Sequence, residues 1–361
     1  MAAKIYHQLC ETMKTRGGMY PGMDIPEFYE LAEALFSPEE AAVSIGLPRG
    51  FHTAGEIAKA MEKDVEWVAP LLEAMADKGL CFSIKKGETP VYAGPPFVPG
   101  IFEYQFMRGT TTERDRTLAR LIQKYKTAVD AARKPLKNVF PAMRVIAVNR
   151  TIKAENRIHT YDQVKHYIET YDPLAVSTCY CRHQAKLVDE ASHCGKPDDV
   201  CLQFGTGAAF VIERGMGRSI SKAEALEILD RAENAGLVHC TNNRQEIDFL
   251  CNCCSCHCVI LKSAKAQPKP GLAVNSGFHP IFNTDLCESC ENCKERCPMS
   301  AIWMNESNYP TVDLEQCIGC GLCATGCPNE AIMMEARMGI PQPPANNKEL
   351  KKAIQDSLRV A

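Results

Sequence analysis

The chain has 361 residues, a formal net charge of −3 and 20 cysteines. This length allows two or three domains, and no run approaches the roughly 18 consecutive apolar residues of a membrane-spanning helix. So many cysteines suggest a disulfide framework only in a short secreted chain, and Met1–His7 lacks the apolar core of a signal peptide. The composition therefore argues against a secreted disulfide scaffold, against a membrane protein and against nucleic acid as the obvious partner.

Residues 26–93 are predicted to form a small helical unit that ends in a hairpin. Pro26 to Phe36 has apolar residues at helical spacing, and Thr53-Ala54-Gly55-Glu56 is a capping box that begins a second helix. A third helix with one apolar stripe is expected from Asp64 to the glycine at 79. Two strands around a Lys-Gly-Glu turn are expected between Cys81 and Ala93.

This order of helices and hairpin resembles a winged helix-turn-helix domain, so residues 1–107 are predicted to be winged-helix-like. The resemblance implies DNA binding, but residues 1–90 contain nine Lys or Arg against fourteen Asp or Glu. The expected recognition helix carries Glu66, Glu73 and Asp77. Because phosphate neutralisation supplies most non-specific DNA affinity, we expect a winged-helix fold that contacts protein rather than DNA.

Residues 108–173 are predicted to be a basic helical connector, with thirteen Lys or Arg and only four acids in residues 108–160. A helix is expected over Thr111–Ala132, a short strand over Val145–Val148 and a second helix from Thr160 to Tyr171. The basic run is either a solvated face or a docking surface that steers an acidic partner.

Residues 174–262 are predicted to be a cysteine-rich α/β domain that binds metal and begins with a strand at Leu174–Thr178. The candidate ligands are Cys179, Cys181, Cys194, Cys201, Cys251, Cys253, Cys254, Cys256 and Cys258. The first four of these have a spacing that allows them to surround one cluster. A tenth cysteine, Cys240, follows His239, which is interpreted as a core histidine rather than a ligand.

Alternate residues of an extended chain share a face, so Cys251 and Cys253 are predicted to point one way. Cys254, Cys256 and Cys258 are predicted to point the other way. The segment then serves two metal centres, or one centre with spare thiols. Structural zinc is the alternative to iron and sulfur, because zinc also accepts four thiolates. Three histidines are candidates to join it: His183, His193 and His257.

Between these cysteine groups, the capping box Ser221-Lys222-Ala223-Glu224 predicts a helix that ends at Gly236. Gly205-Thr206-Gly207 and Gly215-Met216-Gly217 do not complete a dinucleotide fingerprint and are interpreted as turns. The segment Lys262–Gly277, which contains two prolines, is predicted to separate the middle domain from the domain that follows.

One cysteine signature occurs twice between Cys287 and Pro328, with the copies 30 residues apart. The copies read C-E-S-C-E-N-C-K-E-R-C-P and C-I-G-C-G-L-C-A-T-G-C-P, so each is C-x2-C-x2-C-x3-C-P. Two-residue gaps let a tight loop place three thiolates around one small cube of iron and sulfur. Residues 283–333 therefore resemble a bacterial-type two-cluster ferredoxin, and a ferredoxin-like domain is predicted over 278–335. Zinc or disulfides are the alternative.

In such ferredoxins the fourth cysteine of each run ligates the other cluster. The resemblance implies one [4Fe–4S] ligand set of Cys287, Cys290, Cys293 and Cys327. It implies a second set of Cys317, Cys320, Cys323 and Cys297. The middle region is also similar to iron–sulfur proteins of strict anaerobes that combine C-x-C-R and C-N-C-C elements with a ferredoxin. That similarity implies one or two further clusters, and His257 departs from it by standing where a cysteine is expected.

Residues 336–361 are predicted to be a tail with an extended Pro341–Pro344 spacer and a short helix over Lys348–Val360. Such a tail either folds back on its own domain or docks a partner. The predicted fold class is thus α+β and multi-domain: winged-helix-like, cysteine-rich α/β and ferredoxin-like in that order.

The expected function is electron transfer, as a subunit or partner of a larger anaerobic oxidoreductase. Single electrons would pass between the ferredoxin-type clusters and a middle-domain iron–sulfur centre. A redox partner is required because no flavin or nicotinamide motif is present, and dense thiols predict a reducing, cytoplasmic location. The alternatives are a cluster-dependent transcriptional regulator and an oxidoreductase whose catalytic centre lies in the middle domain.

Overall fold

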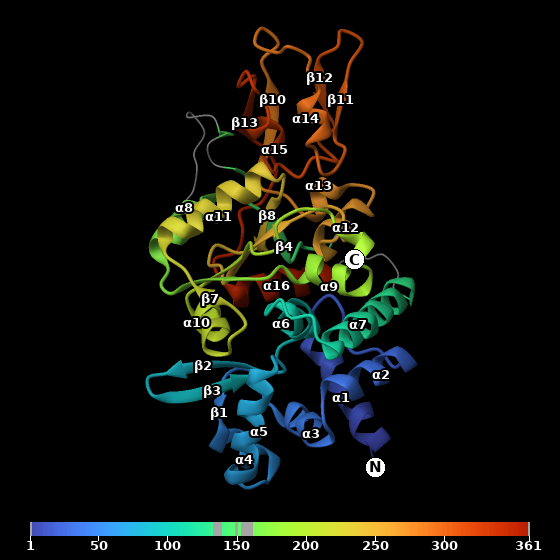
Figure 1. The fold of residues 1–361 in the computed structure, drawn as a ribbon, viewed down its shortest axis with the longest axis vertical. Helices are drawn as coiled ribbons and strands as arrows, with labels where there is room; N and C mark the ends of the chain where they lie inside the picture. Colours follow the sequence, from blue (N-terminus) through green and yellow to red (C-terminus); the bar gives the residue numbers. More distant parts are fainter. Residues whose placement is uncertain (1, 133–138, 149–150, 153–161, 360–361) are drawn as a thin grey trace. The chain divides into compact units, whose positions relative to one another are not determined.

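The computed structural model describes residues 2–132, 139–148, 151–152 and 162–359, and these divide into two compact units (Figure 1). The first unit comprises Met1–Pro135, Ser177–His193 and Ala209–Arg218. The second comprises Leu136–Val176, Cys194–Ala208 and Ser219–Ala361. Both units mix helices and strands. Across the described residues, no helix is both long enough and apolar enough to cross a bilayer.

The first unit is mainly helical. Its helices are α1 (Ala2–Arg16), α2 (Pro26–Leu35), α3 (Pro38–Gly46), α4 (Ala54–Met61), α5 (Val65–Asp77), α6 (Phe102–Phe106), α7 (Glu113–Ala132) and α9 (Tyr180–Val188). A small antiparallel sheet of order β1-β3-β2 contains β1 (His52–Thr53), β2 (Phe82–Lys86) and β3 (Thr89–Ala93). The hairpin and the three helices expected between residues 26 and 93 are therefore present, with α3 in addition.

Local hydrogen bonds explain where these helices begin. Thr53 Oγ1 accepts from the Glu56 backbone N–H at 3.2 Å, and the Glu56 carboxylate accepts from the Thr53 N–H at 2.8 Å. This reciprocal pair satisfies two N–H groups at the start of α4, which confirms the predicted capping box. In α5 the stripe is buried from Val68 onward, whereas Val65 is 39% exposed and lies outside it.

The long helix α7 is held by aromatic packing rather than by its charges. Its Tyr125 ring contacts Phe28, Phe97 and Phe102, with centroids 5.9 to 6.4 Å apart, and its hydroxyl donates to the Pro21 carbonyl. On the exposed face, Lys124 pairs with a glutamate of α2 at 2.7 Å. Part of the predicted basic run is thus neutralised within the unit. Six of its thirteen cations lie outside the described residues: Arg133, Lys134, Lys137, Arg150, Lys153 and Arg157.

A buried arginine ties the hairpin region to the end of α10 (Thr206–Glu213). Arg214 is only 6% exposed and donates to Glu73 at 2.8 Å, Asp77 at 2.9 Å and the Ser83 hydroxyl at 3.0 Å. Because both carboxylates are about half exposed, we expect Arg214→Met to lower the free energy of unfolding by only about 1–2 kcal/mol.

The same substitution has a pH signature. The hydrogen bond from Arg214 holds the pKa of Glu73 below its usual value. The stabilisation is therefore present above the unfolded-state pKa of about 4.3 and is lost as the pH falls through the lower folded-state pKa. The difference between wild type and Arg214→Met in urea unfolding should shrink below about pH 4. Lys85→Met, which removes an exposed pair with Glu213, is the control, and an equal difference at pH 3 and pH 7 would contradict the assignment.

The second unit is built on a sheet of order β4-β8-β9-β6-β5-β7. Its strands are β4 (Met143–Val145), β5 (Leu174–Ser177), β6 (Cys201–Phe204), β7 (Arg218–Ser219), β8 (Val238–Asn242) and β9 (Phe249–Cys253). Helices α8 (Val164–Thr170) and α11 (Lys222–Asn234) cover an apolar core that includes Ile168, Leu202 and Ile228. Ser221 Oγ accepts from the Glu224 N–H at 3.1 Å and begins α11 as predicted.

One glycine segment is only partly a turn. Gly205 forms the turn between β6 and α10, whereas Thr206 and Gly207 are the first residues of α10. Gly205 has a φ of +53°, which explains a glycine at the turn. The remaining glycine of the dinucleotide fingerprint is still missing, because Phe210 occupies its position.

The ferredoxin-like segment closes on itself. Its elements are β10 (Phe278–Phe282), α14 (Asn292–Glu295), β11 (Ile302–Met304), β12 (Pro310–Val312), α15 (Leu322–Thr325) and β13 (Ile332–Ala336). Strand β10 pairs with β13 and β11 pairs with β12, both antiparallel, as Figure 1 shows. The duplicated sequence thus gives two loop–helix–strand repeats, each paired with a strand that precedes a loop.

The segments on either side of it are packed rather than free. Residues 262–277, expected to be a linker, contain the end of α12 (Val259–Lys265) and α13 (Pro270–Ala273), and Val274 is buried. In the tail, the Pro344 carbonyl accepts from the Gln245 N–H at 2.8 Å. Helix α16 (Asn347–Leu358) follows, and its Ser357 hydroxyl accepts from the Phe140 N–H at 2.8 Å. The tail therefore folds back on its own unit.

Candidate metal centres

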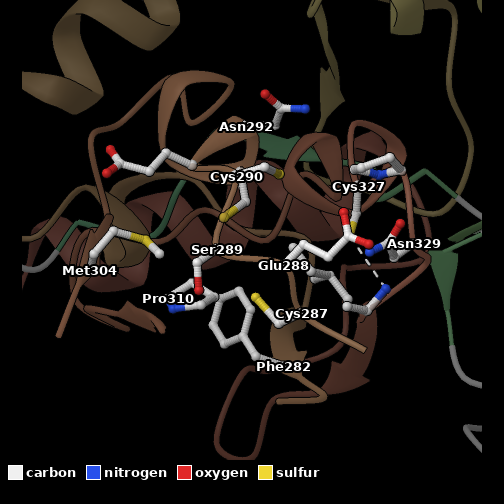
Figure 2. A pocket seen from close by; sticks show the side chains of 15 residues that line it. Phe282, Cys287, Glu288, Ser289, Cys290, Asn292, Met304, Pro310, Cys327 and Asn329 are labelled. Atoms are coloured by element: carbon white, nitrogen blue, oxygen red, sulfur yellow. Dashed lines mark hydrogen bonds between the residues drawn. The ribbon is translucent and has the colours of Figure 1, made fainter. Parts of the chain in front are cut away.

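The two cysteine runs surround two pockets, and each pocket receives cysteines from both runs. The first is lined by Cys287, Cys290, Cys293 and Cys327, and is called the outer centre. The second is lined by Cys317, Cys320, Cys323 and Cys297, and is called the inner centre. Figure 2 shows Cys287, Cys290 and Cys327 at the outer centre, together with the apolar side chains of Phe282, Met304 and Pro310. The exchange of the fourth cysteine matches the sets that the ferredoxin resemblance implies.

The two loops share an unusual backbone pattern. Ser289 and Glu291 in the first run have φ values of +56° and +61°. The residues 30 positions later, Gly319 and Gly321, have values of +71° and +81°. Ser300 and Glu330 form a third such pair, at +55° and +50°. Left-handed residues turn the chain sharply between ligands, so the same loop shape is built twice from different residue types.

Packing explains why only the second loop uses glycine. A Cβ on Gly319 would lie 2.2 Å from the Phe278 carbonyl oxygen and 2.4 Å from Ser276 Oγ. A Cβ on Gly321 would lie 2.9 Å from Thr151 Oγ1. The inner loop is therefore pressed against its own unit and has no room for a side chain. In contrast, Ser289 and Glu291 of the outer loop keep their side chains at half-buried positions.

Backbone N–H groups point at the sulfur atoms. Cys297 Sγ accepts from the Ala301 N–H at 3.2 Å, and Cys327 Sγ accepts from the Ala331 N–H at 3.3 Å. Burial raises the pKa of the Cys317 thiol to about 11, and it raises the pKa values of Cys320 and Cys323 further. Buried sulfurs that receive N–H donors are suited to thiolate ligands of a cluster, because metal replaces the proton and the N–H groups stabilise the remaining charge. The residues present therefore fit two [4Fe–4S] clusters.

The two centres differ in exposure, which gives a prediction. Cys290 is exposed and Cys287 and Cys327 are half-buried, whereas Cys320 and Cys323 are buried. We expect a chelator to remove iron from the anaerobic protein in two phases, with the outer centre losing its iron first because solvent reaches its ligands. Iron release followed by absorbance should lose the fast phase in Cys290→Ser and the slow phase in Cys320→Ser. The reverse assignment of the phases would contradict the order.

A compact ligand group lies in the middle region. The ligand atoms of Cys194, Cys254, Cys256 and His257 all lie within 4.8 Å of one another. Burial and the neighbouring thiols of Cys254 and Cys194 raise the pKa of Cys256 to about 12. Four ligands at about 2.3 Å from one zinc ion in a tetrahedron are about 3.8 Å apart, so this spacing fits a single ion. His257 thus joins a group of cysteines, as the zinc alternative allows.

The remaining cysteines of this region form a second group. Cys240 pairs with Cys251 and Val238 with Cys253 across β8 and β9. Cys258 Sγ lies 3.2 Å from Cys253 Sγ. Contact with the thiols of Cys240, Cys251 and Cys258 raises the pKa of Cys253 well above its usual value. Cys251 and Cys253 share a face as predicted, but Cys258 joins them because β9 ends at Cys253 and the chain turns before Cys258.

The earlier candidate ligands fall into different units. Cys179 precedes α9 and Cys181 lies within it, both in the first unit, whereas Cys194 and Cys201 belong to the second. A single site from these four stays a prediction. Cys201 Sγ accepts from the Gln203 amide at 3.2 Å.

Three other histidines lie near cysteines in the sequence: His183, His193 and His239. His183 donates to the Thr110 carbonyl at 2.8 Å. His193 is the last residue of its segment of the first unit. His239 is buried, with Nδ1 2.6 Å from Asn252 Oδ1 and Nε2 3.2 Å from Glu233 Oε1, which agrees with its interpretation as a core residue.

Two residues near the centres were not predicted. The sequence patterns assign no ligand role to Cys240, although the alternation of apolar residues in Val238–Asn242 places it on one face of a strand. Arg296 precedes the fourth cysteine of the first run, and its side chain donates to the Leu322 carbonyl at 3.0 Å and the Glu233 carbonyl at 2.9 Å. The aligned position in the second run is Gly326, whose absent Cβ leaves room for Arg296. In the sequence, this contact could have been recognised from the large side chain at position 296 and the glycine at the aligned position 326.

Comparison with known proteins agrees with part of this site. A search of curated proteins finds no match to the chain. Residues 310–333 match a protein family described as a 4Fe-4S binding domain. This segment contains β12, α15 and the second cysteine run from Cys317 to Cys327. This match supports 4Fe–4S cluster binding in the C-terminal part of the chain, and together with the many cysteines it indicates an iron–sulfur protein.

Proposed function

We propose that the protein is a two-cluster ferredoxin-type electron carrier fused to a further metal-binding domain, and that it serves a larger oxidoreductase. The observation that carries the proposal is the pair of pockets, each lined by three cysteines of one run and the fourth cysteine of the other. When bound, each cluster accepts or donates a single electron. For electron transfer, the residues of the two pockets need only hold the clusters and set their potentials.

The side chains around the pockets favour transfer between them. Cys293 of the outer centre and Cys323 of the inner centre belong to one apolar cluster with Ile302 and Ile332. Such side chains exclude water, which keeps the local dielectric low and lets N–H donors and burial set the potentials. The outer centre reaches the surface at Cys290, so a partner is expected to dock there. The exposed Glu288 and Glu295 nearby favour a partner with a basic face.

The rest of the chain is proposed to provide a docking domain and a third metal centre. The order α3, β1, α4, α5, β2 and β3 supports a winged-helix-like domain within residues 1–107, with residues 108–173 as a connector. The exposed Trp67 and the carboxylates of α5 favour protein contact over DNA. Residues 174–262 supply the middle-domain centre, and 278–335 supply the two clusters. A cytoplasmic location in an anaerobe follows from the need to keep free thiols reduced.

The test is made on the full-length protein purified without oxygen. Iron, acid-labile sulfide and zinc are quantified, and EPR spectra are recorded after reduction with dithionite. We expect at least about eight irons per chain and a signal from reduced [4Fe–4S] clusters. Cys293→Ser and Cys323→Ser should each remove one cluster's signal, whereas Cys10→Ser, at a buried thiol outside every cysteine group described above, should remove none. A protein that contains only zinc and gives no EPR signal on reduction would refute the proposal.

A further inference from the structure

A third group of cysteines shares an apolar core with the inner centre. We infer that Cys240, Cys251, Cys253 and Cys258 hold a further iron–sulfur cluster, as the middle-domain centre that receives electrons from the inner centre. The inference rests on the proposed electron-transfer function and adds Cys240, which neither the sequence patterns nor the family match assigns. It also separates these four thiols from the compact group of Cys194, Cys254, Cys256 and His257.

Strand pairing brings three of the thiols together. In an antiparallel pair, residues directly opposite each other point to the same face of the sheet. Cys240 is opposite Cys251, and Cys253 is opposite Val238, two residues along each strand, so the three sulfurs share one face of β8 and β9. On the other face, His239 and Asn252 hydrogen-bond to each other and fix this register. The three thiols therefore cannot turn away without breaking the sheet.

The fourth thiol comes from the turn after β9. The Cys258 N–H donates to the Cys254 carbonyl at 3.2 Å, which folds the chain back and places Cys258 Sγ 3.2 Å from Cys253 Sγ. Cys240, Cys253 and Cys258 are at most 5% exposed. Four thiols gathered at one site, three of them buried and Cys251 half-buried, form a complete ligand set, because a metal centre replaces the thiol protons and balances the resulting charge.

The site is continuous with the inner centre. Cys240, Cys253 and Cys258 belong to the same apolar core as Cys320, and Cys297 and Cys317 pack against that core. A short segment also joins the two sites, because Val145 at the end of β4 pairs with Cys240, and the Val148 N–H three residues later donates to the Cys320 carbonyl at 3.2 Å. Three residues of chain span at most roughly 10 Å, so these two contacts place the sites close to each other at one apolar core.

This position favours iron over zinc. Zinc is redox-inert, and a zinc site gains nothing from a place beside an electron carrier. The more exposed group around Cys256 has the single-ion spacing that zinc prefers. A disulfide between Cys253 and Cys258 would need sulfurs about 2.05 Å apart and would leave the other two thiols without a role.

The experiment compares three full-length variants purified without oxygen: Cys240→Ser, Cys256→Ser and Cys10→Ser. Iron, sulfide and zinc are counted per chain, and ⁵⁷Fe Mössbauer and EPR spectra are recorded. We expect about twelve irons in the wild type and about eight in Cys240→Ser, a loss of one-third. Cys256→Ser should keep the wild-type iron and lose zinc, and Cys10→Ser should keep both. The wild-type count keeps the test valid even if Cys240→Ser does not fold.

The outcomes separate the inference from the proposed function. A wild type with about eight irons, or a Cys240→Ser variant with unchanged iron, overturns the third cluster and leaves the ferredoxin clusters intact. Zinc at this site, seen as zinc loss in Cys240→Ser, also overturns it. A free-thiol count that shows a Cys253–Cys258 disulfide in the anaerobic protein overturns it too. A wild type with no iron overturns the proposed function itself.

Discussion

Gly319→Ala is expected to destabilise the protein by about 2–5 kcal/mol and to empty the inner centre. An L-residue at a φ of +71° costs roughly 1–2 kcal/mol, and the new methyl group would collide with the Phe278 carbonyl oxygen. The loop cannot move away, because the Ser276 hydroxyl donates to the Gly319 carbonyl at 2.6 Å. The measurement is denaturant unfolding of the anaerobic protein, together with its iron content.

The matched control is the same change at the equivalent position of the outer loop. Ser289 already has a side chain at a positive φ, so Ser289→Ala should change the stability by less than about 0.5 kcal/mol and keep all the iron. Ser289→Gly should be neutral or stabilising, because glycine adopts this conformation without strain. Equal effects of alanine at 289 and 319 would show that packing does not distinguish the two loops.

Arg296→Ala is the second large effect, with an expected loss of about 2–3 kcal/mol. Its guanidinium donates to carbonyls of two segments: Leu322 in the second run and Glu233 near the end of α11. It also donates to the Thr325 hydroxyl at 3.3 Å. A cation at the C-terminal end of a helix interacts favourably with the carbonyl groups of its last turn. Removing the side chain should therefore loosen the inner loop, which hydrogen exchange of residues 320–327 would show as faster exchange.

Two variants define the source of this effect. Lys294→Ala removes a neighbouring cation whose ion pair with the half-buried Glu291 lies near the surface, and it should cost less than about 1 kcal/mol. Arg296→Lys keeps the charge but cannot reach both carbonyls in a fixed planar geometry, so it should recover less than half of the loss. Full recovery by lysine would mean that charge alone, rather than the hydrogen bonds, stabilises this contact.

Features set by neighbouring residues were predictable. The capping box at Thr53, the N-cap at Ser221 and the strand at Leu174 each depend on a few adjacent residues. Three thiols of each cysteine run are equally local, since two-residue gaps bring them around one cube, whereas the exchange of the fourth cysteine is implied only by the ferredoxin resemblance. These features are present in the structure because the residues that determine them are adjacent in the sequence and do not depend on distant contacts.

Features set by distant pairing were not predictable. Cys240 joins Cys251 only because β8 lies beside β9, and the sequence does not state that register. Cys194 lies beside Cys254 and Cys256 although four strands and two helices separate them in the sequence: β6, α10, β7, α11, β8 and β9. The alternation rule assigned Cys258 to the wrong face because it assumed an extended chain beyond Cys253, where the strand ends. The prolines at 268 and 270 suggested a free linker, but the residues around them supply apolar side chains to a core.

The pairing of β10 with β13 changes how the architecture is understood. The Arg337 N–H donates to the Gly277 carbonyl at 2.8 Å, so the ferredoxin-like segment enters and leaves at one point. The chain beyond it returns to Gln245 and Phe140, which precede the segment within the same compact unit. The segment is thus an insertion into a host domain whose own polypeptide resumes afterwards, rather than a module appended to the end of the chain. An excision would need only a short junction across 277–337, but it would also expose the apolar face that the host presents to the inner centre.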